Sequence, residues 1–103
     1  MSMHLGNWQL GKAQGEASGD AEDTIFESRH NIDLIVTIRV TSRSTTVVRV
    51  ESSGGRLGEL GGRGRNEART FYVKAATQIW VRADSNAPLV SGDYQLTILA
   101  DPS

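Results

Sequence analysis

The side chains with catalytic potential in this 103-residue chain are its serines, its two histidines and its twelve carboxylates, because it contains no cysteine. His30 and Asp33 lie close together in the sequence, and a serine nucleophile would need such a base and acid. The chain has no Gly-x-Ser-x-Gly turn to present a nucleophile at the end of a strand. We therefore expect no catalytic residues and predict that the protein is not an enzyme.

Metal binding would depend on carboxylates, since two histidines without cysteine do not make a typical zinc site. Calcium takes clustered oxygen ligands, and Asp20, Glu22 and Asp23 lie within one segment, with Asp93 as a further candidate from another loop. Their spacing differs from that of an EF-hand. We predict no metal and no cofactor, and the sequence alone leaves open whether calcium binds near residues 20–23.

The segment 52–68, SSGGRLGELGGRGRNEA, combines six glycines with three arginines. It lacks the GxxxxGK[ST] pattern of a phosphate-binding loop. Its GGRGR motif occurs once, without interleaved aromatic residues, so nucleic acid is not the expected partner. A loop of this length in a small domain is typically functional or disordered. We predict that it orders against a neighbouring subunit through apolar anchors and arginine–carboxylate pairs, with Arg56, Leu57, Leu60, Arg63 and Arg65 as interface residues.

The elements that must position these residues are indicated by apolar side chains at every second position. The longest such run, residues 32–40 (IDLIVTIRV), predicts a half-buried central strand. Further strands are expected at residues 24–28, 46–51, 69–75, 78–84 and 93–100, with a seventh near Trp8. A short polar link predicts a hairpin joining 32–40 to 46–51, and a short connection predicts another joining 69–75 to 78–84. No helical period is present, so we predict an all-β fold, an antiparallel β-sandwich or jelly roll of six to eight strands.

The length fits a single domain over residues 1–103. Residues 11–23 are rich in glycine, alanine and acid, so we predict an N-terminal arm over residues 1–23 and an irregular Gly/Arg-rich loop over residues 52–68. No apolar run is long enough to span a bilayer, and the first residues lack a signal-peptide pattern. We expect a protein made in the cytoplasm, with no membrane partner.

The alternation that turns one set of strand residues inward leaves large apolar side chains pointing outward. Several of them on one outer face would mark a partner site, whereas an arm carrying Trp8 and Leu10 would instead cover that face. Outside the 52–68 segment, the predicted interface residues are Trp8, Ile35, Tyr72, Trp80 and Leu99.

Residues 70–99 end in a phrase of the form G-x-Y-x-L-x-V, carried here by Gly92, Tyr94, Leu96 and Ile98. This segment resembles the end of a pre-peptidase C-terminal domain, and residues 23–38, DTIFESRHNIDLIVTI, resemble that family's opening strands. The resemblance implies a non-catalytic β-sandwich that accompanies larger, secreted proteins. Some relatives bind calcium, but the expected acidic residues between the first strands are not clearly present here.

Charge is segregated along the chain, with a balance of −4 over residues 1–38 and +5 over residues 39–74 within a net charge of −1. Acidic and basic regions of this kind can pair within one molecule or between copies. Our main hypothesis is a structural protein of an assembly, by analogy a phage capsid decoration or cement subunit. It would pack against copies of itself or a larger capsid protein in a virion assembled in the host cytoplasm. The alternative is a secreted, stand-alone module that binds protein or carbohydrate.

Overall fold

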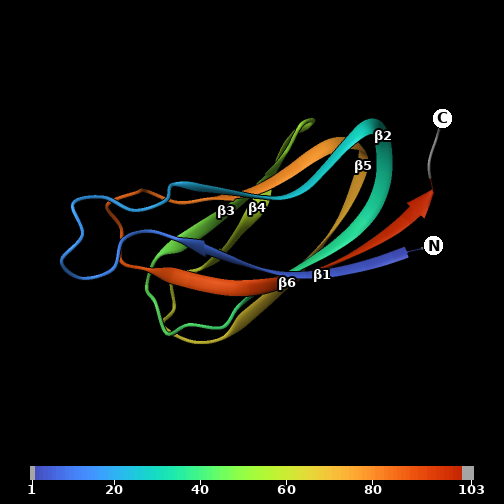
Figure 1. Cartoon of the computed structure of the whole chain (residues 1–103). Coiled ribbons are helices and arrows are strands. Elements are labelled where there is room, and N and C mark those ends of the chain that lie inside the picture. The colour runs from blue at the N-terminus through green and yellow to red at the C-terminus, as the bar shows by residue number, and fades with distance from the viewer. Residues whose placement is uncertain (1, 101–103) are drawn as a thin grey trace.

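The chain, described over residues 2–100 by a computed structural model, forms six antiparallel strands and no helix in that range. The strands are β1 (Ser2–Leu10), β2 (Glu22–Val40), β3 (Val47–Ser52), β4 (Gly55–Gly61), β5 (Glu67–Arg82) and β6 (Val90–Ala100). They join in one sheet in the order β1-β6-β2-β5-β3-β4 (Figure 1). The predicted all-β fold is confirmed. Within the same residues, nothing helical is long and apolar enough to cross a membrane.

Two long strands fold this sheet over on itself. β2 and β5 pair along most of their lengths, but the register shifts between Glu27 and Ile32, where β2 has more residues than β5. Extra residues in one strand bend it and increase its twist, and Figure 1 shows β2 curving back near its label. The first layer therefore contains β1, β6 and residues 32–40 and 67–76, and the second contains β3, β4 and residues 22–27 and 78–82.

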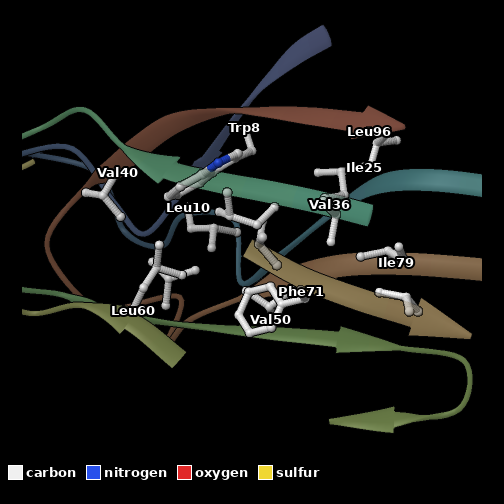
Figure 2. Packing of buried hydrophobic residues seen from close by; sticks show 14 of the residues in the cluster. Trp8, Leu10, Ile25, Val36, Val40, Val50, Leu60, Phe71, Ile79 and Leu96 are labelled. Carbon is white, nitrogen blue, oxygen red and sulfur yellow. The ribbon is translucent and has the colours of Figure 1, made fainter. Parts of the chain in front are cut away.

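The hydrophobic core lies between the two layers and receives side chains from all six strands. Leu34, Val36 and Ile38 on β2 are fully buried, as the alternation over residues 32–40 predicts. Figure 2 shows Trp8 of β1 and Phe71 of β5 reaching into the same cluster. Packing of two apolar sheet faces against each other is what defines a β-sandwich, so the predicted sandwich is formed here by one continuous sheet.

Both predicted hairpins are wrong. β2 pairs with β5 and β6, and the link over residues 41–46 carries the chain from the first layer to β3 in the second. Residues 69–75 and 78–84 are not partners, because residues 67–82 form the single strand β5. Ala75 at the bend adopts a left-handed φ of 55°, and its amide donates a hydrogen bond to Asp33 Oδ1 at 2.8 Å. The connection expected at residues 76–77 is instead a bend within the long strand β5.

The predicted N-terminal arm and the predicted Gly/Arg-rich loop both contain strands, and the strand expected near Trp8 is confirmed. Within the predicted arm, residues 2–10 form β1, which pairs with β6 along its whole length. Within the predicted 52–68 loop, residues 55–61 form β4, paired with β3. Leu60 is 3% exposed, so it belongs to the core and is not an anchor for another subunit, and Leu57 is half-buried against the same core. Only residues 62–66 remain as a loop between β4 and β5.

Candidate functional site

The outer face of the first layer presents three rows of side chains that cross neighbouring strands. The pairing register aligns them, and alternation turns them away from the core. The rows are Asn7–Asp93–Arg39, then Leu5–Gln95–Thr37–Thr70, then Met3–Thr97–Ile35–Tyr72. We call these eleven residues the outer face. One end of it is polar and charged, and the other end is apolar.

The polar end is organised by an ion pair. Arg39 donates from Nε to Asp93 Oδ1 at 2.6 Å and from its Nη2 to Asp93 Oδ2 at 2.7 Å. A bidentate pair of this kind fixes the orientation of both side chains. The hydrogen bond from Arg39 to Asp93 raises the pKa of Arg39 above its usual value, so the guanidinium stays charged. Both side chains remain partly exposed, at 59% for Arg39 and 29% for Asp93, so a ligand can reach them.

A hollow lies along this polar end. It has a volume of about 450 Å³, and its lining includes Leu5, Asn7, Arg39, Asp93 and Gln95. That volume falls in the range typical of small-molecule sites, roughly 300–1,000 Å³. Arg39 also lines a second hollow of about 330 Å³, which reaches the loop at residues 62–66. Both hollows are lined by Arg39, and together we call them the groove.

The apolar end carries exposed large side chains. Met3 is 60% exposed, Leu5 70% and Tyr72 60%, and Ile35 lies between them at 36%. Leu99 is half-buried, two residues beyond Thr97 on β6. The structure thus brings Ile35 and Tyr72 to one side of the molecule, as the alternation predicts, whereas Leu99 is the unpaired residue of β6 at a register shift and its predicted role stays a prediction.

Trp80 does not join them, because β5 bends and residues 78–82 belong to the second layer. Its indole Nε1 donates to Glu51 Oε1 at 2.9 Å. Glu51 also lies 3.3 Å from the Arg82 guanidinium, which pairs in turn with Glu22 at 2.5 Å. The hydrogen bond to Glu22 raises the pKa of Arg82. The Trp80 side chain is therefore half-buried and hydrogen-bonded within a charged network on the opposite face.

Trp8 is a further correction to the predicted interface. It is 2% exposed, and its indole Nε1 donates to the main-chain oxygen of Asp93 at 3.1 Å. Trp8 and Leu10 lie on the inward side of β1, so they form part of the core and do not cover an outer face. Among the loop arginines, Arg56 pairs with Glu59 within β4, whereas Arg63 and Arg65 are exposed in the loop that follows.

The second-layer network predicts a modest, salt-dependent effect on stability. We expect Glu22→Gln to lower the melting temperature slightly at low salt, because it removes a partner of Arg82. Salt screens such exposed pairs, so the difference between variant and parent should vanish in about 1 M NaCl. Thermal unfolding followed by circular dichroism at both salt concentrations measures this. A difference in melting temperature that is equally large at high salt would contradict an electrostatic contribution of the Glu22–Arg82 pair.

The residues first considered for chemistry are dispersed. Over residues 2–100, no three His, Asp or Glu side chains gather as a metal site would require, including the acidic segment 20–23. Asp33 accepts the Ala75 amide at the bend of β5. His30 is exposed, and its amide donates to Ser28 Oγ at 3.2 Å.

The sequence analysis missed the polar end of the outer face. Asn7, Arg39, Asp93 and Gln95 come from three strands, and Arg39 and Asp93 are 54 positions apart. Alternation alone indicates that each points outward. Bringing them together requires the strand order β1-β6-β2 and its register, which the sequence pattern does not contain.

Comparison with known proteins gives structural likeness only. No protein-family model matches the chain, and no curated protein matches it. One similar solved structure is the C-terminal CBM6 module of LamC, a marine laminarinase from Zobellia galactanivorans, at 13% identity and a TM-score of 0.48, covering 91% of this chain and 90% of that one. Another is a carbohydrate-binding module (CBM6cm-2) of lichenase 5A from Cellvibrio mixtus in complex with cellotriose, at 11% identity and a TM-score of 0.47, covering 93% and 88%. At these identities and TM-scores, the function has to be argued from this chain's own residues. The resemblance to pre-peptidase C-terminal domains rests on the sequence segments quoted above.

Proposed function

We propose that the protein is a non-catalytic binding module that holds a glycan on the outer face of its first layer. The observation that carries this proposal is the bidentate Arg39–Asp93 pair in the groove, with Asn7 and Gln95 beside it. Sugar hydroxyls both donate and accept hydrogen bonds. The groove offers donors from Arg39, acceptors from Asp93 and both from the two amides. The ion pair holds its side chains in place before a ligand arrives, which reduces the entropy cost of binding.

The apolar end of the outer face complements these polar groups. Pyranose rings carry C–H groups on their faces as well as hydroxyls at their edges, so a glycan site combines apolar surface with hydrogen-bonding groups. Tyr72 supplies an exposed aromatic ring, and Leu5 lines the groove itself. Neighbouring strands lie about 4.8 Å apart, so a face four strands wide has room for more than one sugar unit.

Removing the aromatic ring should weaken binding to a limited extent. We expect Tyr72→Ala to raise the dissociation constant of a bound oligosaccharide about three- to tenfold, because contacts of this kind contribute about 0.5–1.5 kcal/mol. Affinity electrophoresis against a panel of soluble polysaccharides identifies the ligand, and calorimetry with its oligosaccharides measures the effect.

Two controls accompany that measurement. Tyr72→Phe keeps the ring and should bind like the parent. Val47→Ala removes a side chain that is 46% exposed on the second layer, and it should have no effect on binding. Failure to bind any polysaccharide in the panel would refute the proposed function.

A second candidate is assembly with other protein subunits, and the exposed apolar row favours it. Met3, Leu5, Ile35 and Tyr72 form part of one face, and contiguous apolar surface is typical of protein interfaces. A capsid decoration subunit located in a virion would be one form of this candidate. Light scattering over a concentration series distinguishes it from the glycan module, because self-assembly through this face predicts oligomers that Leu5→Ser dissociates.

A further inference from the structure

Three arginines gather in two loops at one end of the molecule. Arg43 lies in the loop at residues 41–46, and Arg63 and Arg65 lie in the loop at residues 62–66, where all three are exposed. The loops run side by side, since a Cβ placed on Gly64 would be 4.0 Å from the main-chain oxygen of Arg43. We call Arg43, Arg63 and Arg65 the basic end.

The charge of the basic end is not neutralised by nearby carboxylates. Among residues 2–100, the arginines with a carboxylate within 4.0 Å are Arg39, Arg56 and Arg82. Glu67, which lines the hollow beyond Arg39, accepts the Gly61 amide with its Oε2 at 2.7 Å and forms no ion pair with the basic end. Guanidinium groups left without a partner create a positive potential that attracts anions.

The basic end adjoins the groove. The hollow beyond Arg39 is lined by Thr41 and Asn66, which belong to the same two loops. Asn66 directly follows Arg65, and Thr41 is two residues before Arg43. A chain molecule that lies in the groove and passes Arg39 therefore reaches the basic end.

We propose that the ligand of the outer face is an acidic glycan, a polysaccharide bearing carboxylate or sulfate groups, with an acidic group held at the basic end. This inference rests on the proposed function and narrows its ligand class. The guanidinium fork matches the oxygen geometry of carboxylate and of sulfate or phosphate-like anions. Asp93 takes the Nε–Nη2 edge of Arg39 and offsets its charge, whereas the arginines of the basic end have no such partner, so we assign the selection for an acidic group to the basic end.

Neither loop carries an aromatic residue, as residues 41–46 read TSRSTT and residues 62–66 read GRGRN. Proteins that bind single-stranded nucleic acid stack bases on aromatic side chains. A sugar polymer with spaced acidic groups needs no such platform at this end, so the observations favour the glycan over a nucleic acid.

The test compares matched charge variants on matched polymers. One double variant, Arg63→Gln with Arg65→Gln, removes two charges from the basic end. The other double variant, Arg29→Gln with Arg49→Gln, removes two exposed charges elsewhere, so the two double variants have the same net charge as each other. Circular dichroism establishes that both are folded. Binding of polygalacturonate, dextran sulfate, unmodified dextran, a neutral galactan and an RNA oligonucleotide is then measured at low and high salt.

We expect the parent to bind an acidic polysaccharide and to bind its neutral counterpart more weakly. The basic-end variant should lose at least about tenfold in affinity at low salt, because hydrogen bonds to charged groups are among the stronger ones. The control variant should change less than about twofold in about 0.15 M salt, where exposed charges farther than about 8 Å from the ligand are screened. Equal losses in both variants, or tighter binding of RNA through the same arginines, would overturn the inference. Binding of neutral glycans alone overturns it while the proposed function stands, and binding of no glycan removes both.

Discussion

Replacing Asp93 by alanine is expected to weaken glycan binding about ten- to hundredfold while leaving the protein folded, since hydrogen bonds to charged groups are strong ones. Asp93 does two things in the groove. It supplies acceptor oxygens directly, and it holds Arg39 through two short hydrogen bonds. Without it, the guanidinium can rotate away from the groove, and a ligand must order it on binding. Calorimetric titration of the purified variant with the oligosaccharide identified for the parent measures the loss.

Two variants separate this effect from a general loss of structure. Asp93→Asn keeps the shape and one acceptor oxygen, so its affinity should lie between those of the parent and the alanine variant. Glu22→Gln breaks a comparable exposed ion pair on the second layer, and it should leave affinity unchanged. If Asp93→Ala binds as tightly as the parent while Tyr72→Ala does not, the ligand lies at the apolar end and the polar end is not part of the site.

Period-two alternation predicts which way each strand residue faces, because that depends only on local geometry. It placed Leu34, Val36 and Ile38 in the core and Ile35 outside, and the structure confirms these positions. It could not predict the strand pairing. The buried positions of β2 change from odd-numbered at Ile25 to even-numbered from Ile32 onward, and the residues between Glu27 and Ile32 resemble a turn as much as a bend.

The same bend limits what the sequence can predict about the site. Tyr72 and Trp80 both occupy outward positions on β5, yet they lie on opposite faces because the strand crosses from one layer to the other between them. Trp8 lies in a segment whose composition suggested an arm, and its burial depends on β6 as a partner. The proposed function depends on groups such as Arg39 and Asp93. The pairing of β2 with β6 brings these two residues together, and no motif in the sequence predicts that pairing.

The largest effect on stability is expected at Gly92. This glycine lies in β6 between Trp8 of β1 and Val40 of β2, directly before Asp93. A Cβ at Gly92 would collide with the main-chain oxygen of Arg39 and would lie 2.7 Å from Cζ2 of the Trp8 ring. The carbonyl belongs to the paired strand β2 and the ring is buried, so neither can move freely.

We therefore expect Gly92→Ala to lower the free energy of unfolding by about 3 kcal/mol, at the upper end of the cost of overpacking a core. Gly54→Ala is the matched control, because its added Cβ would meet nothing closer than Ser52 Oγ at 3.7 Å. Urea unfolding of both variants measures the difference, and equal stabilities would contradict the close approach of β6 and β2.

Arg39 and Asp93 flank this contact on the outer side. A shift large enough to admit the methyl group should also separate their paired side chains, so Gly92→Ala should lose glycan affinity in the fraction that remains folded. The glycine is thus expected to support the fold and the site through the same close approach of two strands.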